Sequence, residues 1–333
     1  MPRVPTAQPN EQSRQKELKK IEAYKGLVSQ VNERVSRHQL REIYTLTNSQ
    51  INAKDYTGET LILTSNLLHQ NPEYYTIWNC RRLILQDAIR KELSSQEDGA
   101  KPKAQGGNDV GSERLSEAQR EIHLILKEDL TYTLPLLQGY PKCYWIWNHR
   151  RWLLNQTSES LPVPVSLVFW REELGLVSKM LNYDSRNFHG WSYRREVVRE
   201  LERLGSQEDH DSTDRQTSMV ESEFAYTTKM IKTNLSNFSA WHNRSQLIPR
   251  LLDERKADNA DRRKLLDAEI DFITQALYTD PSDQSLWFYH QFLMNAVSTN
   301  PHPTAAFMPG LTNQDRLESV SYTHLTLPTK RIV

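Results

Sequence analysis

The sequence predicts an all-α protein built as a solenoid of helical hairpins, and three observations support this fold class. Only 11 of the 333 residues are glycine, and residues with high helix propensity fill many segments. A motif centred on one tryptophan recurs five times along the chain. Apolar residues recur at helical spacing on both sides of that tryptophan, which predicts a helix before it and a helix that contains it.

The five copies of the motif set the length of the repeat. Their tryptophans are separated by 69, 44, 50 and 46 residues, in the order Trp78, Trp147, Trp191, Trp241 and Trp287. The first interval is longer because it contains residues 94–112, whose Gly, Lys, Asp, Gln and Ser content predicts a flexible insertion. Without that stretch the interval is about 50 residues, which is typical of two-helix repeats and exceeds the roughly 34 residues of tetratricopeptide units.

Each copy predicts a helix, a tight turn and a second helix. Ahead of Trp191, the Asp184-Ser185 pair interrupts the helical pattern and offers a cap for the helix that follows. Prolines disfavour continuation of the first helix in three other copies. They occupy the equivalent turn position as Pro72, Pro141 and Pro281.

The repeats divide the chain into three regions. Residues 1–48 predict a charged helical segment with a thin apolar strip, and residues 49–300 hold the five repeats. Residues 301–333 carry no repeat signature. We therefore expect an irregular tail there, either a non-native sequence or a truncated final repeat.

An arginine follows the tryptophan by three residues in four copies, on the same face of the helix. One interpretation is architectural: the tryptophan fills the hairpin core while the arginine bonds loop carbonyls or acidic groups of a neighbouring repeat. The other is a series of phosphate-binding arginines. The first is favoured, because the pattern repeats in every unit whereas an active site occurs once. The arginines are Arg81, Arg150, Arg194 and Arg244, and His290 takes the place in the fifth copy.

Composition excludes several classes of protein. The 42 basic and 42 acidic side chains balance, which gives no support for a nucleic-acid binder. Neither Cys80 nor Cys143 belongs to a CxxC pair, so we expect no disulfide framework and no cysteine-based zinc site, in keeping with a reduced cytoplasmic setting. No run of 18 apolar residues predicts a membrane span. The histidines are scattered and are expected to be structural: His123, His149, His242 and His290.

The motif of an aromatic residue followed by x-x-Trp-x-x-Arg resembles the repeat of protein prenyltransferase α subunits. The segments NPEYYTIWNCRR, at residues 71–82, and RNFHGWSYRR, at residues 186–195, resemble the α subunit that acts on Rab GTPases. The resemblance implies a right-handed crescent of paired helices around a β subunit. It also implies that the β subunit carries the zinc site and most of the isoprenoid pocket, so that this chain alone binds no cofactor and no metal.

The resemblance also implies site residues. Lys142 matches the α-subunit lysine that reaches the isoprenoid diphosphate, and Tyr144 and His189 match neighbours that line the same opening. Without the resemblance, the favoured interpretation of Lys142 is a solvated turn residue. Trp145 stands where the farnesyl-type subunit has a glutamine that helps to hold the C-terminal carboxylate of the substrate.

These features lead to one expected function and two alternatives. We expect the α subunit of a heterodimeric Rab geranylgeranyltransferase, which transfers geranylgeranyl from its diphosphate to C-terminal cysteines of Rab GTPases held by an escort protein. The first alternative is the shared α subunit of farnesyltransferase and type I geranylgeranyltransferase, which acts on Caax proteins. The second is a helical-repeat adaptor without enzymatic activity.

Overall fold

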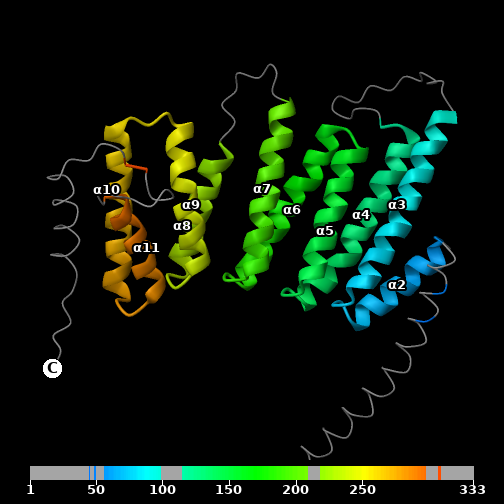
Figure 1. Cartoon of the computed structure of the whole chain (residues 1–333), viewed down its shortest axis with the longest axis horizontal. Helices are drawn as coiled ribbons and strands as arrows, with labels where there is room; N and C mark the ends of the chain where they lie inside the picture. The colour runs from blue at the N-terminus through cyan, green and yellow to red at the C-terminus, as the bar shows by residue number, and fades with distance from the viewer. Residues whose placement is uncertain are drawn as a thin grey trace, which may run out of the picture. The chain divides into compact units, whose positions relative to one another are not determined.

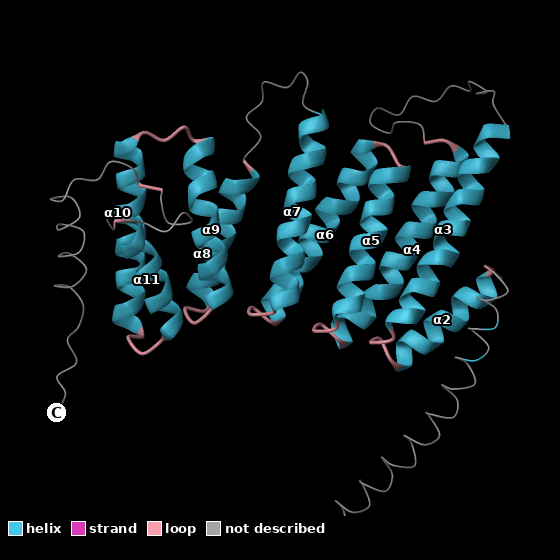
Figure 2. Ribbon diagram, viewed as in Figure 1, coloured by secondary structure: helices cyan, strands magenta, loops and turns pink. Residues whose placement is uncertain are grey.

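The computed structural model describes Thr45, Ser49 and residues 56–98, 115–208, 218–297 and 307–308. These residues form helices and turns, without a strand in any of the described ranges (Figures 1 and 2). The chain divides into two compact units, Met1–Leu153 and Leu154–Val333. The predicted N-terminal segment lies outside the described residues apart from Thr45, and the predicted tail lies outside them apart from Phe307 and Met308.

The described part of the first unit holds three complete helices and the beginning of a fourth. They are α2 (Gly58–Gln70), α3 (Tyr75–Asp98), α4 (Glu117–Gly139) and α5 (Tyr144–Ser160), of which α5 continues beyond Leu153. Helix α3 packs against both α2 and α4. The turns that join α2 to α3 and α4 to α5 lie at the same end of this unit (Figure 2).

Among the described residues of the second unit, three hairpins follow the same plan. They are α6 (Val163–Tyr183) with α7 (Phe188–Glu208), α8 (Met219–Thr233) with α9 (Phe238–Glu254), and α10 (Asn259–Thr279) with α11 (Gln284–Ala296). The two helices of each hairpin pack together, and α9 also packs against α11. The predicted all-α stack of hairpins is confirmed.

Local sequence explains where the helices begin. Ser116 caps α4 through a capping box with Gln119, and Ser218 and Asp258 accept amide hydrogens at the starts of α8 and α10. Each of these side chains satisfies a backbone N–H that has no partner inside the helix. Helix α3 ends later than expected, because it continues through Asp98 and so includes the first residues of the stretch 94–112; residues 99–114 lie outside the described part.

The turn inside each hairpin is fixed by two kinds of hydrogen bond. In four of the five turns the first residue is Asn or Asp, and its side chain accepts from the amide two residues later, forming an Asx turn. In all five, the tryptophan indole N–H donates to the carbonyl six residues earlier, at 2.8–2.9 Å. These carbonyls belong to Pro72, Pro141, Ser185, Leu235 and Pro281. The predicted turns are therefore confirmed, and the indole is one of the groups that hold them.

The burial predicted for the repeat tryptophans holds in four copies and is wrong in the fifth. Trp78, Trp147, Trp191 and Trp241 are 0–3% exposed, whereas Trp287 is 39% exposed. The reason is visible in the packing: Trp78 lies against His149, and Trp241 lies against Tyr289, each with ring centroids 4.7 Å apart. In both pairs the covering residue comes from the next repeat. Trp287 belongs to the last described hairpin, so no following hairpin among the described residues covers it.

Candidate functional site

The turn between α4 and α5 presents two of the predicted site residues. Lys142 is the third residue of this turn and is exposed, and Tyr144, the first residue of α5, has 48% of its surface exposed. Cys143 lies between them and is buried. Lys142 and Tyr144 therefore face outward from the same turn, and Cys143 between them faces inward.

The same turn is anchored on both sides. The Pro141 carbonyl accepts the Trp147 indole N–H at 2.9 Å, and the Cys143 thiol donates to the Pro72 carbonyl of the preceding turn at 3.3 Å. Burial raises the pKa of this thiol to about 11, so Cys143 stays protonated and acts as a hydrogen-bond donor. Lys142 therefore projects from a backbone whose position is fixed by its neighbours.

Trp145 packs against the first residues of the second helices of two hairpins. Its ring lies 5.5 Å from that of Tyr75, the first residue of α3, and 5.2 Å from that of Tyr144. An indole held between two phenol rings offers one N–H donor and a large apolar surface. This surface differs from the amide that the sequence comparison with farnesyl-type subunits would place here.

His189 is the second residue of α7 and belongs to the second unit. Its ring is partly exposed and meets the edge of Phe188, with centroids 5.7 Å apart. The structure thus brings Lys142 and Tyr144 together in one turn of the first unit, and places His189 at the start of an equivalent helix in the second unit.

The arginines three residues after the tryptophans are structural, as the architectural interpretation predicts. Three of the four bond an acidic side chain on the first helix of the next hairpin, and all four arginines are buried. The pairs are Arg81 with Asp129, Arg194 with Glu223 and Arg244 with Glu269, joined by Nε–H bonds of 2.7 Å. Arg150 is equally buried and donates to the Leu130 carbonyl at 2.6 Å and to Thr133 at 2.7 Å. A phosphate-binding role for Arg81, Arg194 and Arg244 is therefore wrong.

These arginines also bond the first helix of their own hairpin. Arg81 donates to Thr64 and Ser65 on α2, and Arg194 donates to Ser178 on α6. Arg244 does the same with Thr227 and Thr228 on α8. One guanidinium therefore ties three helices together, which a planar group with five donors can do and a lysine cannot.

The acidic partners were not predicted from the sequence, although their spacing from the tryptophan is regular. An acidic residue lies 18 residues ahead of the tryptophan in the last four copies, at Asp129, Glu173, Glu223 and Glu269. The residue two positions after the tryptophan reaches back to this acid in three copies. His149 bonds Asp129 at 2.6 Å, Tyr193 bonds Glu173 at 2.9 Å and Tyr289 bonds Glu269 at 2.6 Å. The second and third copies therefore carry the complete motif of an acid, a tryptophan, a polar ring and an arginine.

Asp129 and His149 form a buried polar pair that resembles a catalytic dyad only in composition. Burial would raise the pKa of Asp129, but the hydrogen bonds and charges of His149 and Arg81 lower it to about 2. Burial lowers the pKa of His149, and Arg82 donates to its Nδ1, which leaves the proton on Nε2 facing Asp129. The imidazole is fully buried beneath Trp78 and cannot reach a substrate, so the structural role predicted for His149 is confirmed.

The described residues contain neither a cluster of metal-ligating side chains nor a helix able to span a membrane. No three His, Cys, Asp or Glu side chains in these ranges converge as ligands would. None of the described helices combines the length and the apolar character that crossing a bilayer requires. A zinc ion therefore has no donor set to fit within the described part of this chain.

The hairpins match a known family. Five segments match the protein prenyltransferase alpha subunit repeat, at residues 57–88, 126–157, 170–201, 220–251 and 266–297. Each segment runs from the first helix of a hairpin into the second.

Several proteins are similar in sequence to this chain over most of its length. The geranylgeranyl transferase type-2 subunit alpha of Saccharomyces cerevisiae is 37% identical over 257 residues, which cover 76% of this chain and 64% of that protein. The subunit of the same name from Schizosaccharomyces pombe is 36% identical over 307 residues, covering 91% and 72%. The human one is 32% identical over 267 residues, covering 78% and 39%. The chain spans slightly less than two thirds of the budding-yeast relative. On these grounds the chain belongs to the family of protein prenyltransferase alpha subunits.

Proposed function

We propose that this chain is the α subunit of a heterodimeric type-2 geranylgeranyltransferase. The enzyme would transfer geranylgeranyl from geranylgeranyl diphosphate to C-terminal cysteines of Rab GTPases presented by an escort protein, in the cytoplasm. The observation that carries the proposal is the five-fold repeat together with relatives that bear this name over 76–91% of the chain in two yeasts. A helical stack whose second helices expose aromatic residues is suited to binding a partner chain.

The contribution of this chain to the chemistry would come from its turn residues. In prenyl transfer the thiolate of the substrate forms a bond to the allylic carbon while the bond from that carbon to the diphosphate breaks. Negative charge therefore builds on the departing diphosphate, and a nearby cation lowers the barrier. Lys142 offers an exposed ammonium for this purpose, and Tyr144 and His189 offer hydrogen-bond donors. Zinc, which activates thiols by favouring the thiolate, would be held by the second subunit.

Trp145 favours the Rab enzyme over the Caax alternative. A subunit that reads a C-terminal carboxylate needs a polar side chain at this position, and the Trp145 ring is instead packed against Tyr75 and Tyr144. An indole with one N–H donor is a poor replacement for an amide that must hold a carboxylate. This is the reason to rank the farnesyl-type function second.

The test is reconstitution with the second subunit. The chain is co-expressed with the β subunit of a type-2 geranylgeranyltransferase, and separately with that of a farnesyltransferase. Each dimer is given an escort-bound Rab and a short Caax peptide with the matching isoprenoid diphosphate. Transfer to the Rab complex by the first pair supports the proposal. Use of the free peptide without use of the Rab complex supports the farnesyl-type alternative, and absence of any stable dimer supports the adaptor.

A further inference from the structure

Three repeats contain two consecutive arginines, and the two residues of each doublet have different surroundings. The first arginine is the buried one that ties helices together. The second lies four residues after the tryptophan, as Arg82, Arg151 and Arg195. Within the described part of the chain none of these three has a carboxylate partner. Their hydrogen bonds go to neutral groups: His149, Asn148 and Asn243.

Arg195 in the second unit is the clearest case. It donates to the Asn243 side-chain oxygen at 2.9 Å across the space between α7 and α9. Burial and the nearby charge of Arg199 lower the pKa of Arg195, and burial and Arg195 lower the pKa of His242. Arg199 pairs with Glu196 on its own helix, with 3.5 Å between Nη1 and Oε2, and the Arg199 side chain is largely exposed. Positive charge at this place is therefore incompletely neutralised.

The first unit contains a second example of the same arrangement. Burial and the charge of Arg151 lower the pKa of Arg82, and one buried Nη2 of Arg82 has no hydrogen-bond acceptor. Buried donors in folded proteins are nearly always satisfied, so an orphaned one suggests a missing acceptor. Arg82 and Arg195 both lie four residues after the tryptophan of their repeat. An arginine without an acidic partner at this position is therefore a feature of the repeat and not of one helix.

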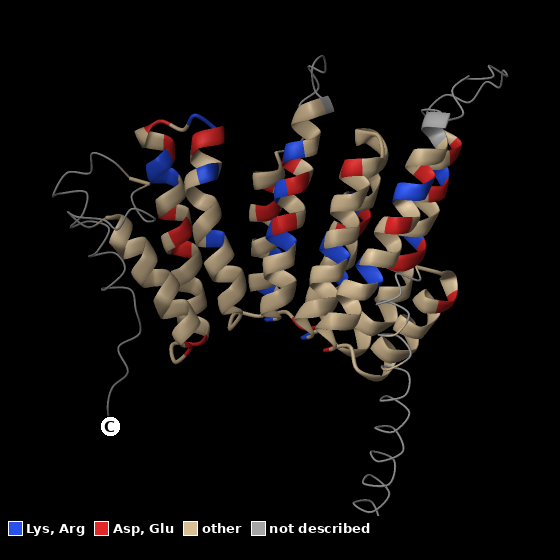
Figure 3. Ribbon diagram, turned by 45° about the vertical axis from the view of Figure 1, so that its right-hand side comes forward, with Lys and Arg blue, Asp and Glu red and all other residues tan. Residues whose placement is uncertain are grey.

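A groove of about 290 Å³ surrounds Arg195. Trp191, Val198 and Leu247 supply its apolar wall, and Arg199 and Gln246 supply further donors. Arg250 closes one end and is already neutralised by two bonds to Glu202, at 2.8 and 3.0 Å. Acidic and basic residues are otherwise interspersed along the helices of this unit (Figure 3).

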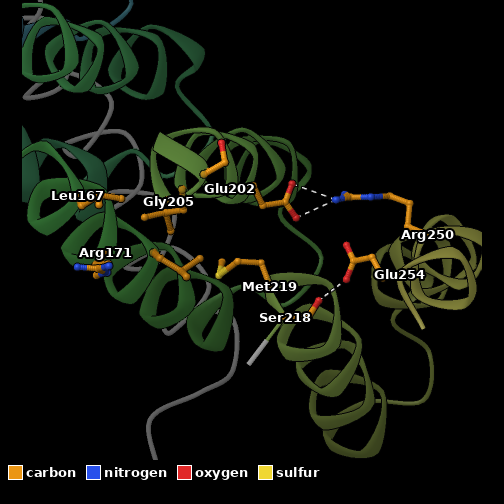
Figure 4. Close-up of a pocket in the computed structure, with 11 residues that line it drawn as sticks. Leu167, Arg171, Glu202, Gly205, Ser218, Met219, Arg250 and Glu254 are labelled. Atoms are coloured by element: carbon orange, nitrogen blue, oxygen red, sulfur yellow. Dashed lines mark hydrogen bonds and ion pairs between the residues drawn. The ribbon is translucent and has the colours of Figure 1, made fainter. Parts of the chain in front are cut away.

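Arg250 also lines a second cavity of about 590 Å³, together with its partner Glu202 (Figure 4). That cavity has an apolar floor, but two of its charged groups already have partners, since Glu202 is paired with Arg250 and Glu254 accepts from Ser218. Unlike the groove around Arg195, this cavity has no excess of positive charge that would indicate which kind of ligand it binds. The smaller groove is therefore the better defined site.

The surface that continues from the groove identifies the kind of ligand. On α9, Phe238, His242, Gln246 and Arg250 follow one another at intervals of four residues and so share a face. At the turn end of this unit, Phe188 is 73% exposed and Phe238 is 49% exposed. Exposed aromatic rings beside arginines are the composition of protein–protein interfaces, whereas a site for a free anion needs no such apolar border.

We infer that the groove between α7 and α9 receives an aspartate or glutamate side chain of the second subunit, held by Arg195 with Arg199. The inference rests on the proposed function, which requires such a subunit. The planar guanidinium of Arg195 matches a carboxylate in a two-bond geometry. The aliphatic part of the acidic side chain packs against Val198 and Leu247, and the aromatic residues at the turn end pack against apolar residues of the partner.

The experiment compares variants of the full chain, each co-expressed with the type-2 β subunit. The dissociation constant of the dimer is measured at about 50 and 300 mM salt for the wild type, Arg195→Ala and Arg195→Glu. We expect Arg195→Ala to weaken assembly about tenfold, Arg195→Glu to weaken it further, and both to reduce the salt dependence. Arg203→Ala is the matched control, because Arg203 lies on the same helix, is exposed and is already paired with Glu200 at 2.7 Å.

A second readout separates binding from folding. Arg194→Ala removes the neighbouring arginine of the same doublet and should lower the unfolding temperature of the full chain, whereas Arg195→Ala should leave it unchanged or raise it by removing repulsion with Arg199. Dimer affinity of Arg195→Glu equal to that of the wild type overturns the inference and leaves the proposed function intact. If the wild-type chain itself forms no dimer with the β subunit, the proposed function fails and the inference fails with it.

Discussion

The tryptophan of each repeat has two roles that separate substitutions can distinguish. Its rings fill the space between hairpins, where the next repeat covers them, and its N–H holds a turn carbonyl six residues earlier. A phenylalanine could fill much of the space but could not hold the turn. The combination explains why one residue type recurs at the same place in turns with otherwise different sequences.

We predict that Trp241→Phe costs about 1–3 kcal/mol of unfolding free energy. Trp241 is 1% exposed and donates to the Leu235 carbonyl at 2.8 Å, so phenylalanine removes a hydrogen bond and leaves an acceptor poorly satisfied. Trp287→Phe is the matched control, because it breaks the same kind of bond at an exposed site, and should cost about 0.5 kcal/mol. Urea unfolding of the full chain measures both free energies. Equal losses of unfolding free energy in the two variants would show that the buried hydrogen bond stabilises the fold no more than the exposed one.

The Asp129–His149 pair predicts how stability depends on pH. Both groups have folded pKa values below their ordinary ones, so the unfolded chain binds more protons as the solution becomes acidic. The contribution of His149 is present above about pH 6.5 and is lost as the pH falls below that value. The contribution of Asp129 is present above about pH 4 and is lost as the pH falls toward 2.

We predict that His149→Asn flattens this profile between pH 7 and pH 5. Asparagine occupies the equivalent place in the fourth repeat, as Asn243, so the helix accepts it there. The variant should be less stable at pH 7, because Asp129 loses its imidazole partner, but should lose less stability on acidification. Urea midpoints measured from pH 4 to pH 7 test this, and a variant whose slope matches that of the wild type would contradict the assignment.

At the scale of helices and hairpins, the linkage between repeats depends on buried ion pairs. Arg244 on α9 bonds Glu269 on α10 through two nitrogens, while its other donors hold α8. Burial lowers the pKa of Arg244, but the bonds and charge of Glu269 outweigh that effect and raise it. Such a pair orders three helices, yet the cost of desolvating both charges offsets much of its attraction.

We predict that Arg244→Met alone destabilises the chain by about 3–5 kcal/mol, since it strands Glu269 as a buried charge. Arg244→Met combined with Glu269→Gln should cost less than the sum of the single changes, because no unpaired charge remains. Arg255→Ala serves as control: its pair with Glu221 is exposed, at 3.0 Å, and should contribute about 0–1 kcal/mol. If the stability loss of the double variant equals the sum of the losses of the two single variants, Arg244 and Glu269 act independently.

The hairpins could be predicted from sequence because their determinants are local. In each repeat the tryptophan and the turn proline or Asx residue lie within a dozen residues of one another. The acidic partners could also have been found, because each lies 18 residues ahead of a tryptophan. The exposure of Trp287 could not, because it depends on whether another hairpin follows and covers the ring. The pairing of Arg195 with a neutral asparagine 48 residues away was likewise invisible in the sequence.

For the candidate site, sequence and structure contribute unequal parts. The role proposed for Lys142 rests on the family resemblance, since its residue type alone indicates only a polar turn. The structure adds that the turn is anchored at the Pro141 carbonyl and at Cys143 while Lys142 and Tyr144 face outward. The diphosphate would contact groups from more than this chain, so the geometry of the reacting complex is a property of the assembled enzyme.

At the scale of the whole enzyme, we predict that Lys142→Ala slows prenyl transfer about 10²-fold without impairing assembly. The equivalent turn positions hold Glu73, Arg186, Ser236 and Ser282, so the turn itself does not need a lysine. An exposed ammonium contributes little to stability. One placed beside a departing diphosphate could stabilise the transition state by about 2–4 kcal/mol, as single oxyanion donors do.

The measurement is single-turnover transfer by the reconstituted dimer, because product release often limits steady-state turnover and would hide a slower chemical step. Arg186→Ala is the control, since it removes an exposed cation from the same position of another turn. Lys142→Arg should recover part of the rate, because the charge returns while its geometry changes. If Lys142→Ala forms the dimer and transfers the lipid at the wild-type single-turnover rate, then Lys142 is only a solvated turn residue.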